Sequence, residues 1–533
     1  MQIDEQIKQV LQKIINNFGY EANVVLTPSK SHADYSTNLA MVVASKYKLD
    51  VIDFATKVVE QIDKDKLFLT KIEVVKPGFI NFFVSNTSYA NIVNNIILEG
   101  ENFANLKQNK VYNVEFVSAN PTGYLHLGHV RSAAIGATLA NVLEHAGNKV
   151  IREYYINDNG VQIDNLAKSL FTRYQQIFNP NFAMPEDGYF GQDIIWAAQQ
   201  VFDLVKDKYR QKSLENEGVL SFFKETGTKI FLGEIKKDLA QIGIHFDVFS
   251  SEKKLYQDKK IDNLLSSLKH TYKKDDALWL ETTKFGDDKD RVLIKQDGTY
   301  TYFTPDITYH LQKLQSNNPD KLINVWGADH IGYVQRMKSA LSILGYPNKV
   351  DFLIYQLVKL IKNNQELKMS KRRGTSFTLK DLLELCSKDA IRYFMINRSE
   401  NTNLDFDLDQ ANQISDQNPV YIIQYSYARI AQLLLKSEIK EYQATSFFEE
   451  NEIKLINILK EFNEIIATIT KNYKINLLNQ YLLNLAKTFN SFYSNSKIIG
   501  NPNEKNLLAL VKATGIVLKI GLKLIGVSIK ERM

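Results

Sequence analysis

The stretch VEFVSANPTGYLHLGHVRSAAIGATLANVLEHAG, residues 114–147, predicts a strand that turns directly into a helix. Residues 111–117 are β-branched and aromatic, as in a buried strand. Apolar side chains then recur at helical spacing over 129–146, and Gly147 stands where a helix C-cap is expected. A second strand-like segment, KVIREYYIND, follows at 149–158. This order is typical of a βαβ unit, so it predicts a parallel sheet with a right-handed crossover.

Two histidines, His126 and His129, stand where this strand ends and the helix begins, on either side of Gly128. The amino end of such a helix offers unpaired N–H groups and a positive dipole end, which bind phosphate. Neither a P-loop nor a G-x-G-x-x-G turn is present, so we expect the two rings to supply N–H donors to phosphate oxygens. Taken alone, the string also fits core histidines bonded to backbone. A zinc pair is disfavoured because no further ligands follow at metal-site spacing.

A second cationic segment, ELKMSKRRGTSF, follows a predicted strand and contains Lys368 and Lys371. As a bare run of charge it would be a solvated loop. As a loop across the crevice it would neutralise the β- and γ-phosphates during nucleotidyl transfer. Its occurrence in the same chain as the histidine pair favours the second interpretation.

The composition is that of a globular protein: of 533 residues, 44% are hydrophobic and 24% charged. This length suggests roughly three or four domains. The net charge of +6 is compatible with a polyanionic partner but does not require one. The single cysteine, Cys386, excludes an internal disulfide framework and a Cys-based zinc cluster, and its leucine neighbours predict a buried, inert thiol. The amino terminus has no uninterrupted apolar core, so we expect a cytoplasmic monomer without membrane contact.

Changes in pattern divide the chain into three parts. Residues 1–100 predict a small α+β module, and 110–415 a catalytic domain around the parallel sheet, with insertions over about 160–290. From 416 to 533, apolar residues recur at three and four positions in four successive segments, which predicts an all-α bundle.

These segments together resemble the bacterial-type arginyl-tRNA synthetases, a family of class I aminoacyl-tRNA synthetases. HLGH and KMSKR resemble the two class I signature motifs. The similarity extends from end to end through ADYSTNLAM, PGFINFF, REYYINDNGVQID, YFTPDITYHLQKL, NVWGADHIGYVQRMKSAL, NPVYIIQYSYARI and GLKLIGVSIKERM. Local departures are Leu127 between the histidines and Arg372 in place of the final serine of KMSKS, and neither removes a phosphate ligand. The resemblance implies a Rossmann-like catalytic domain, an added amino-terminal domain and a DALR-type anticodon-binding bundle.

The resemblance implies ATP-dependent ligation of L-arginine to its tRNA through an arginyl-adenylate. The implied catalytic residues are His126, His129, Lys368 and Lys371. The implied ATP-binding residues are His126, Gly128, His129, Gly327, Asp329, Met369, Ser370 and Lys371, with Gly327 and Asp329 at the ribose. Mg²⁺ is expected to share the phosphate charge, and no metal site formed by the protein is expected.

Recognition of arginine needs carboxylates, because a guanidinium is always charged and offers five fixed donors. The residues that line up with the family's arginine site are Glu115, Asn120, Tyr302, Asp306 and His330. The resemblance implies that Asp306 pairs with the guanidinium of the substrate, that Glu115 is a second acceptor for it, and that Tyr302 forms a wall of the site. It places Asn120 at the backbone end of the substrate, and His330 where relatives often carry glutamine.

For the tRNA, the resemblance assigns the D-loop to the amino-terminal module and the anticodon to the bundle. Phe79 and Asn81 are suited to stack on and hydrogen-bond a splayed base. Tyr425, Arg429 and Met533 are the anticodon candidates, although a helical pair at four-residue spacing also explains the first two. The segment SEKKLYQDKK is expected to be a solvated face.

Two other functions compete with this one. The first is a different class I synthetase, for instance for cysteine or glutamate, against which stand the paired acids and the absence of Cys-type zinc ligands. The second is a non-catalytic tRNA-binding paralogue, which would bind tRNA without consuming ATP. That alternative calls for damaged phosphate motifs, whereas both motifs are intact here.

Overall fold

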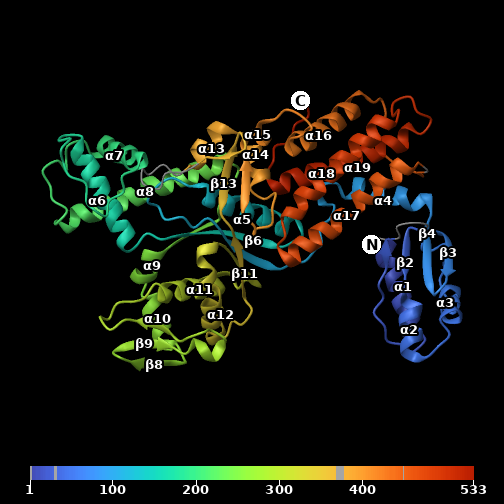
Figure 1. The fold of residues 1–533 in the computed structure, drawn as a ribbon, viewed down its shortest axis with the longest axis horizontal. Coiled ribbons are helices and arrows are strands. Elements are labelled where there is room, and N and C mark those ends of the chain that lie inside the picture. Colours follow the sequence, from blue (N-terminus) through green and yellow to red (C-terminus); the bar gives the residue numbers. More distant parts are fainter. Residues whose placement is uncertain (1–2, 29–32, 368–376, 448) are drawn as a thin grey trace.

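A five-stranded parallel sheet lies at the centre of the molecule (Figure 1). The computed structural model describes residues 3–28, 33–367, 377–447 and 449–533. The sheet has the order β12-β11-β5-β6-β7 and consists of β5 (Val111–Glu115), β6 (Lys149–Ile156), β7 (Val248–Ser251), β11 (Lys321–Gly327) and β12 (Val350–Tyr355). The helix α5 (Leu127–His145) connects β5 to its parallel neighbour β6. The predicted βαβ unit and parallel sheet are therefore confirmed.

The strand order reverses beside β5, and this reversal positions the site. The chain passes from β5 to β6 on one side and later adds β11 on the other. In open α/β sheets, ligands bind in the crevice beyond the carboxyl ends of the strands at such a reversal. Glu115 ends β5 and Gly327 ends β11, and α5 begins directly after His126. The predicted phosphate site thus stands at the expected edge of the sheet.

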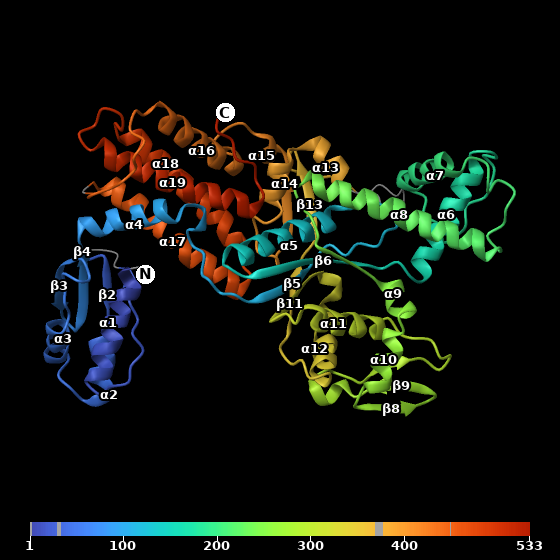
Figure 2. The same ribbon diagram turned by 180° about the vertical axis from the view of Figure 1, so that it is seen from behind.

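The region predicted as insertions, residues 160–290, supplies most of two bodies attached to the sheet (Figure 2). It also contains β7 of the sheet, which the prediction missed, and the second body extends beyond this region to residue 343. The first, the helical arm, consists of α6 (Val161–Gln176), α7 (Gln192–Val205) and α8 (Glu217–Gln241), which pack around a cluster of buried aromatic and aliphatic side chains. The second, the lobe, consists of α9 (Glu252–Gln257), α10 (Lys260–Ser267), β8 (Thr271–Lys274), β9 (Ala277–Leu280), β10 (Arg291–Ile294), α11 (Phe303–Asn317) and α12 (Val334–Ile343). The hairpin-like pattern predicted in this region is confirmed by the antiparallel β9 and β10.

The helix α5 packs so closely on the sheet domain that Gly136 has no room for a side chain. A Cβ atom there would lie 2.1 Å from Cγ of the fully buried Phe116. We expect Gly136→Ala to lower the free energy of unfolding by about 1–3 kcal/mol, the usual effect of overpacking. Gly233→Ala on α8 is the matched control, because a Cβ there meets no described atom within 4 Å. Denaturant unfolding of both variants measures the difference, and equal losses would contradict the prediction.

The segment FLIYQLV, predicted as one strand, is two strands in different sheets. After β12, the chain turns and continues as β13 (Val358–Lys362), which pairs with β15 (Leu404–Asp407) and with β14 (Gln365–Glu366). The break is fixed by the fully buried Arg131 on α5, whose guanidinium donates to the carbonyls of Gln356 (2.7 Å) and Thr402 (2.9 Å). A distant cation therefore ends the strand, which local sequence could not indicate.

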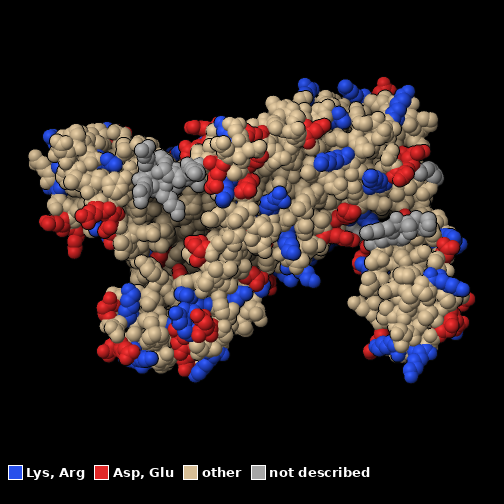
Figure 3. Space-filling model, viewed as in Figure 1, with Lys and Arg blue, Asp and Glu red and all other residues tan. Residues whose placement is uncertain are grey.

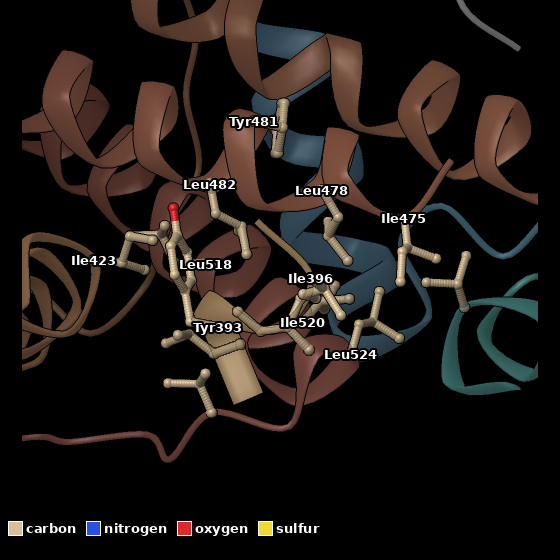
Figure 4. Packing of buried hydrophobic residues seen from close by; sticks show 14 of the residues in the cluster. Tyr393, Ile396, Ile423, Ile475, Leu478, Tyr481, Leu482, Leu518, Ile520 and Leu524 are labelled. Atoms are coloured by element: carbon tan, nitrogen blue, oxygen red, sulfur yellow. The ribbon is translucent and has the colours of Figure 1, made fainter. Parts of the chain in front are cut away.

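The carboxy-terminal part is the predicted four-helix bundle: α16 (Pro419–Lys436), α17 (Glu450–Asn472), α18 (Asn476–Asn495) and α19 (Glu504–Ile525). Its core is continuous with that of the sheet domain. Figure 4 shows Tyr393 and Ile396, which precede the bundle, among Ile423, Leu482 and Leu518 from three of its helices. The short helices α13 (Leu379–Leu385), α14 (Lys388–Phe394) and α15 (Leu408–Asn412) connect the two parts.

The amino-terminal module has a core of its own, which ends near Val84. It contains α1 (Ile3–Asn17), α2 (Leu39–Tyr47), α3 (Val51–Glu60) and the sheet β1-β2-β4-β3, made of β1 (Thr27–Pro28), β2 (Tyr35–Thr37), β4 (Phe79–Val84) and β3 (Leu69–Val75). The next helix, α4 (Asn86–Glu99), packs instead against α17 and α19 of the bundle. None of the helices in the described ranges has the apolar length that crossing a bilayer requires.

Candidate active site

The histidine pair caps the helix that it begins. Nδ1 of His126 accepts a hydrogen bond from the Gly128 N–H (3.1 Å), and Nδ1 of His129 accepts one from the His126 N–H (3.4 Å). Because each Nδ1 acts as an acceptor, the neutral rings carry their hydrogen on Nε2. The rings stack with centroids 3.6 Å apart. Two Nε2–H donors thus lie side by side at the positive end of α5.

Both rings are neutral at pH 7. Desolvation in the crevice lowers the pKa of His126, while nearby Asp329 acts in the opposite sense. Desolvation lowers the pKa of His129 to about 3, and the neighbouring His126 adds to the effect. His126 remains exposed and His129 half-buried, so neither is a core histidine. The pair offers N–H donors whose charge state is constant through the physiological range.

The chain that follows the second signature returns to this pair. Leu379 at the start of α13 donates its N–H to the carbonyl of Leu125 (2.8 Å), and Thr378 forms an isolated antiparallel bridge with His126. The predicted phosphate ligands of the cationic segment, Lys368, Met369, Ser370 and Lys371, lie outside the described residues. The described residues that come after the KMSKR signature therefore contact the HLGH signature directly.

The predicted ribose residues also lie beside the histidines. Gly327 ends β11, and a Cβ atom at this position would lie 2.5 Å from Oδ1 of Asp329. The glycine therefore lets the backbone approach the Asp329 carboxylate closely. Asp329 is near enough to His126 to influence its pKa. His330 turns its Nε2 toward Asp329 Oδ2 (3.3 Å).

A cluster of desolvated carboxylates lies where the lobe meets the sheet. Asp306, in the first turn of α11, accepts a hydrogen bond from the Tyr333 hydroxyl at Oδ2 (2.7 Å). Glu252, the first residue of α9, is 7% exposed. Burial raises the pKa of both carboxyl groups to about 7, and each influences the Tyr155 phenol, whose pKa is raised by burial and then by Glu252 and Asp306. Two unneutralised acids thus share one site.

Glu115 lies near this cluster but differs from its predicted role as an open acceptor. Its Oε2 lies 2.5 Å from Lys313 Nζ, and its Oε1 accepts from the Ser118 hydroxyl (3.0 Å). Burial opposes the charge on Glu115, yet Lys313 and then His310 outweigh it and hold its pKa below the usual range. Both oxygens of Glu115 are therefore engaged, and its charge is already compensated.

Glu252 is the second acid of this cluster, and the sequence interpretation missed it. It belongs to SEKKLYQDKK, which was predicted to be a solvated face because of its lysines. That prediction is wrong for Glu252 and Leu255, which are buried. A signal was present in the sequence: Ser251 is an N-cap residue, and its hydroxyl accepts from the Lys254 N–H (3.3 Å), so Glu252 starts a helix directly after a strand of the sheet.

A hollow lies between the helical arm and the lobe, with acidic side chains at its edge (Figure 3). Tyr302 is 76% exposed and directly precedes α11, which carries Asp306. Asn120 donates from its side chain to Oε1 of Gln162 on the arm. These two polar groups, unlike the engaged Glu115, remain accessible at the surface.

Comparisons with known proteins agree along the whole chain. A family model for the arginyl-tRNA synthetase N-terminal domain matches residues 1–84, one for the class I (R) tRNA synthetase catalytic domain 92–433, and one for the DALR anticodon-binding domain 423–533. An arginine–tRNA ligase of Mesomycoplasma hyopneumoniae (strain 7448) is 54% identical over 533 residues, covering 99% of this chain and 100% of that protein. The chain belongs to the arginyl-tRNA synthetase family.

Further relatives support both the sequence assignment and the fold. The arginine–tRNA ligase of Bacillus subtilis (strain 168) is 44% identical over 559 residues, with 100% of each chain covered. The solved structure of Thermus thermophilus arginyl-tRNA synthetase superposes with a TM-score of 0.78 at 20% identity, covering 99% of this chain and 100% of that one. The predicted family, the class I fold and the assignment as an aminoacyl-tRNA synthetase are confirmed.

The predicted tRNA contacts of this synthetase have the following surroundings. Phe79 and Asn81 lie on the outer face of β4, with Phe79 39% exposed, while alternate residues of the strand enter the core. Arg429 lies between the rings of Tyr425 and Tyr493, each with its centroid 4.7 Å away, and donates to the Tyr425 hydroxyl (3.0 Å). Met533 is 50% exposed at the chain end. The Tyr425–Arg429 pair has the intrahelical contact that a structural role requires, and the tRNA roles remain predictions.

Proposed function

We propose that the chain attaches L-arginine to its tRNA in two steps within the crevice beyond β5 and β11. The arginine carboxylate attacks the α-phosphate of ATP, pyrophosphate leaves and arginyl-adenylate forms; a ribose hydroxyl at the tRNA 3′ end then attacks the arginyl carbonyl and AMP leaves. One observation carries this proposal: two desolvated carboxylates that pair with no cation among the described residues, Asp306 and Glu252, adjoin the same sheet edge as the neutral donor pair His126 and His129.

The acid pair suits a guanidinium better than any other amino acid side chain. Glu252 is buried and Asp306 is half-buried, and neither is paired with a cation among the described residues, whereas Glu115 has Lys313. An arginine side chain is always charged and would place its forked donors on both acids, compensating charges that are costly while the site is empty. Glu115 then acts behind Asp306, where its charge helps to raise the Asp306 pKa. Tyr302 forms a wall of the arginine site, and Asn120 contacts the backbone end of the bound arginine.

The triphosphate is proposed to lie along the amino end of α5. His126 and His129 donate from Nε2 to phosphate oxygens, and the helix end adds its dipole. Asp329, which is near enough to His126 to influence its pKa, is proposed to bind the ribose hydroxyls with Gly327. Mg²⁺ is proposed to enter as part of the MgATP substrate and to share the charge of the phosphates. Lys368 and Lys371 are proposed to neutralise the β- and γ-phosphates.

The tRNA is proposed to span the molecule. Its 3′ end enters the hollow between the arm and the lobe, the amino-terminal module contacts the D-loop through Phe79 and Asn81, and the bundle binds the anticodon through Tyr425, Arg429 and Met533. A cytoplasmic monomer is sufficient for this arrangement, because all the proposed sites lie on one chain.

An ATP–pyrophosphate exchange assay with each of the twenty amino acids, with and without bulk tRNA, tests the substrate. We expect exchange with arginine, and none with cysteine or glutamate. Exchange driven by another amino acid would contradict the arginine assignment. Binding of tRNA with no exchange under any of these conditions would instead indicate the non-catalytic alternative.

Arginine binding is expected to depend on pH, because both acids must be charged to receive the guanidinium. The pKa of each group is raised to about 7 in the empty site, and the bound cation will lower both. Near pH 7, each acid is therefore about half protonated before binding, and arginine releases about one proton in total. The arginine KM should fall as the pH rises from about 6 to 8. Calorimetry in buffers of different ionisation enthalpy measures the proton release, and a value near zero would contradict this prediction.

A further inference from the structure

One lysine of α13 connects the helical arm to the segment that precedes the HLGH signature. Lys380, in the first turn of α13, donates an ion-paired hydrogen bond to Oε1 of Glu234 on α8 and lies 3.5 Å from Oδ1 of Asp238, one turn further along. The side chain of Asp238 is 1% exposed, and that of Glu234 is 11% exposed. Burial raises the pKa of Asp238 to about 6, and Lys380 is the largest influence against it. The lysine thus compensates two acids of the arm.

The same ammonium lies over aromatic rings from two other elements. It is 4.9 Å from the ring centroid of Tyr124, which precedes the histidine pair, and 6.0 Å from that of Trp196 on α7. Tyr124 and Trp196 in turn pack edge to face or tilted against each other and against Phe231 of α8. A cation held by acids on one side and ring faces on the other has few alternative positions.

The backbone connects this cluster to the reacting groups. One residue before Lys380, the Leu379 N–H donates to the carbonyl of Leu125, and Thr378 forms a bridge with His126. Thr378 also caps α13 in a reciprocal capping box with Asp381. A displacement of the first turn of α13 must therefore move the backbone that determines the position of the His126 ring. The route from the arm to His126 consists of two ion pairs, one helix turn and two backbone contacts.

We propose that Lys380 is a positioning residue for adenylate formation, which holds the first turn of α13 between the helical arm and the HLGH segment so that His126 meets the phosphates. It touches neither substrate, so its contribution is made in the transition state, where donor placement within a fraction of an ångström matters. This inference rests on the proposed function, because the reaction that it serves is the proposed arginine activation.

The first test is Lys380→Met, which keeps the length of the side chain and removes its charge. We expect kcat for arginine-dependent ATP–pyrophosphate exchange to fall about tenfold, with the KM values for arginine and ATP within about twofold. Lys380→Arg should restore at least about half of kcat, because a guanidinium keeps both the ion pairs and the ring contacts. Glu234→Gln should lower kcat in the same way, and the double variant Lys380→Met/Glu234→Gln should be no slower than Lys380→Met alone.

The matched control is Lys237→Met. Lys237 also lies near Glu234, with Nζ 3.6 Å from Oε2, but its side chain is 76% exposed, and we expect full activity. A kcat for Lys380→Met within twofold of the parent protein would overturn the inference. A failure of the Lys380→Arg variant to restore kcat would overturn it as well. If Lys380→Met does not fold, as judged by circular dichroism, the kcat of Glu234→Gln is compared with that of Lys237→Met. A kcat of Glu234→Gln equal to that of Lys237→Met would then overturn the inference. A parent protein that shows no arginine-dependent exchange would instead count against the proposed function.

Discussion

Replacement of Asp306 with alanine should raise the KM for arginine by about 30-fold to several thousand-fold and leave the KM for ATP nearly unchanged. Truncation of one partner in a desolvated charge pair typically costs about 2–5 kcal/mol of binding, which corresponds to this range. Asp306 is half-buried and desolvated, and its only described side-chain donor is the Tyr333 hydroxyl. The guanidinium therefore replaces water as its main charge partner. Steady-state exchange kinetics with each substrate varied in turn measure the two KM values.

Three further variants identify the cause of that loss. Asp306→Asn keeps the shape and the bond from Tyr333 but removes the charge, so it should retain most of the defect. Glu252→Gln should also raise the arginine KM selectively, whereas Glu115→Gln should mainly reduce stability, because it leaves Lys313 buried beside a neutral group. Asp203→Asn, which alters an exposed ion pair on the arm, is the control. Equal increases in both KM values for Asp306→Ala would show that the whole crevice had been disturbed.

Removal of the second histidine should act on the reaction rate. His129→Ala is expected to lower kcat for exchange by about 100- to 1,000-fold, the usual effect of losing one preorganised donor to a developing charge, while the ATP KM changes only a few-fold. The ring of His129 is neutral, since desolvation holds its pKa at about 3. It therefore contributes a directed N–H rather than a charge, and its effect should not vary between pH 6 and 8.

His145→Ala is the control for that measurement. His145 lies at the opposite end of the same helix, where Nε2 contacts the carbonyl of Phe103 (2.8 Å). Its loss should affect stability slightly and leave kcat unchanged. If His129→Ala raised the ATP KM by the full factor while kcat stayed constant, the ring would contribute ground-state binding, and its assignment to the transition state would be wrong.

Prediction from the sequence succeeded where the pattern is local. The strand before His126, the helix from 127 to 145 and the four bundle helices follow from apolar periodicity and terminal signals, which depend on residues within a few turns of one another. The prediction of one strand at FLIYQLV failed because Arg131, more than 200 residues earlier in the chain, holds the turn at Gln356 (a separation of 225 residues). The periodicity of a short apolar run does not reveal such a contact.

The sequence alone determined the family and predicted a phosphate site at a strand–helix junction with acids near it, since each inference depends on the identity and order of neighbouring residues. Only the tertiary structure decided which acids are uncompensated. Glu115 is paired with a lysine 198 residues away, whereas Glu252, from a lysine-rich segment, is buried beside Asp306 without one. The physical reason is that burial and nearby charge set the electrostatic state of a carboxylate, and both come from elements that meet only when the chain is folded.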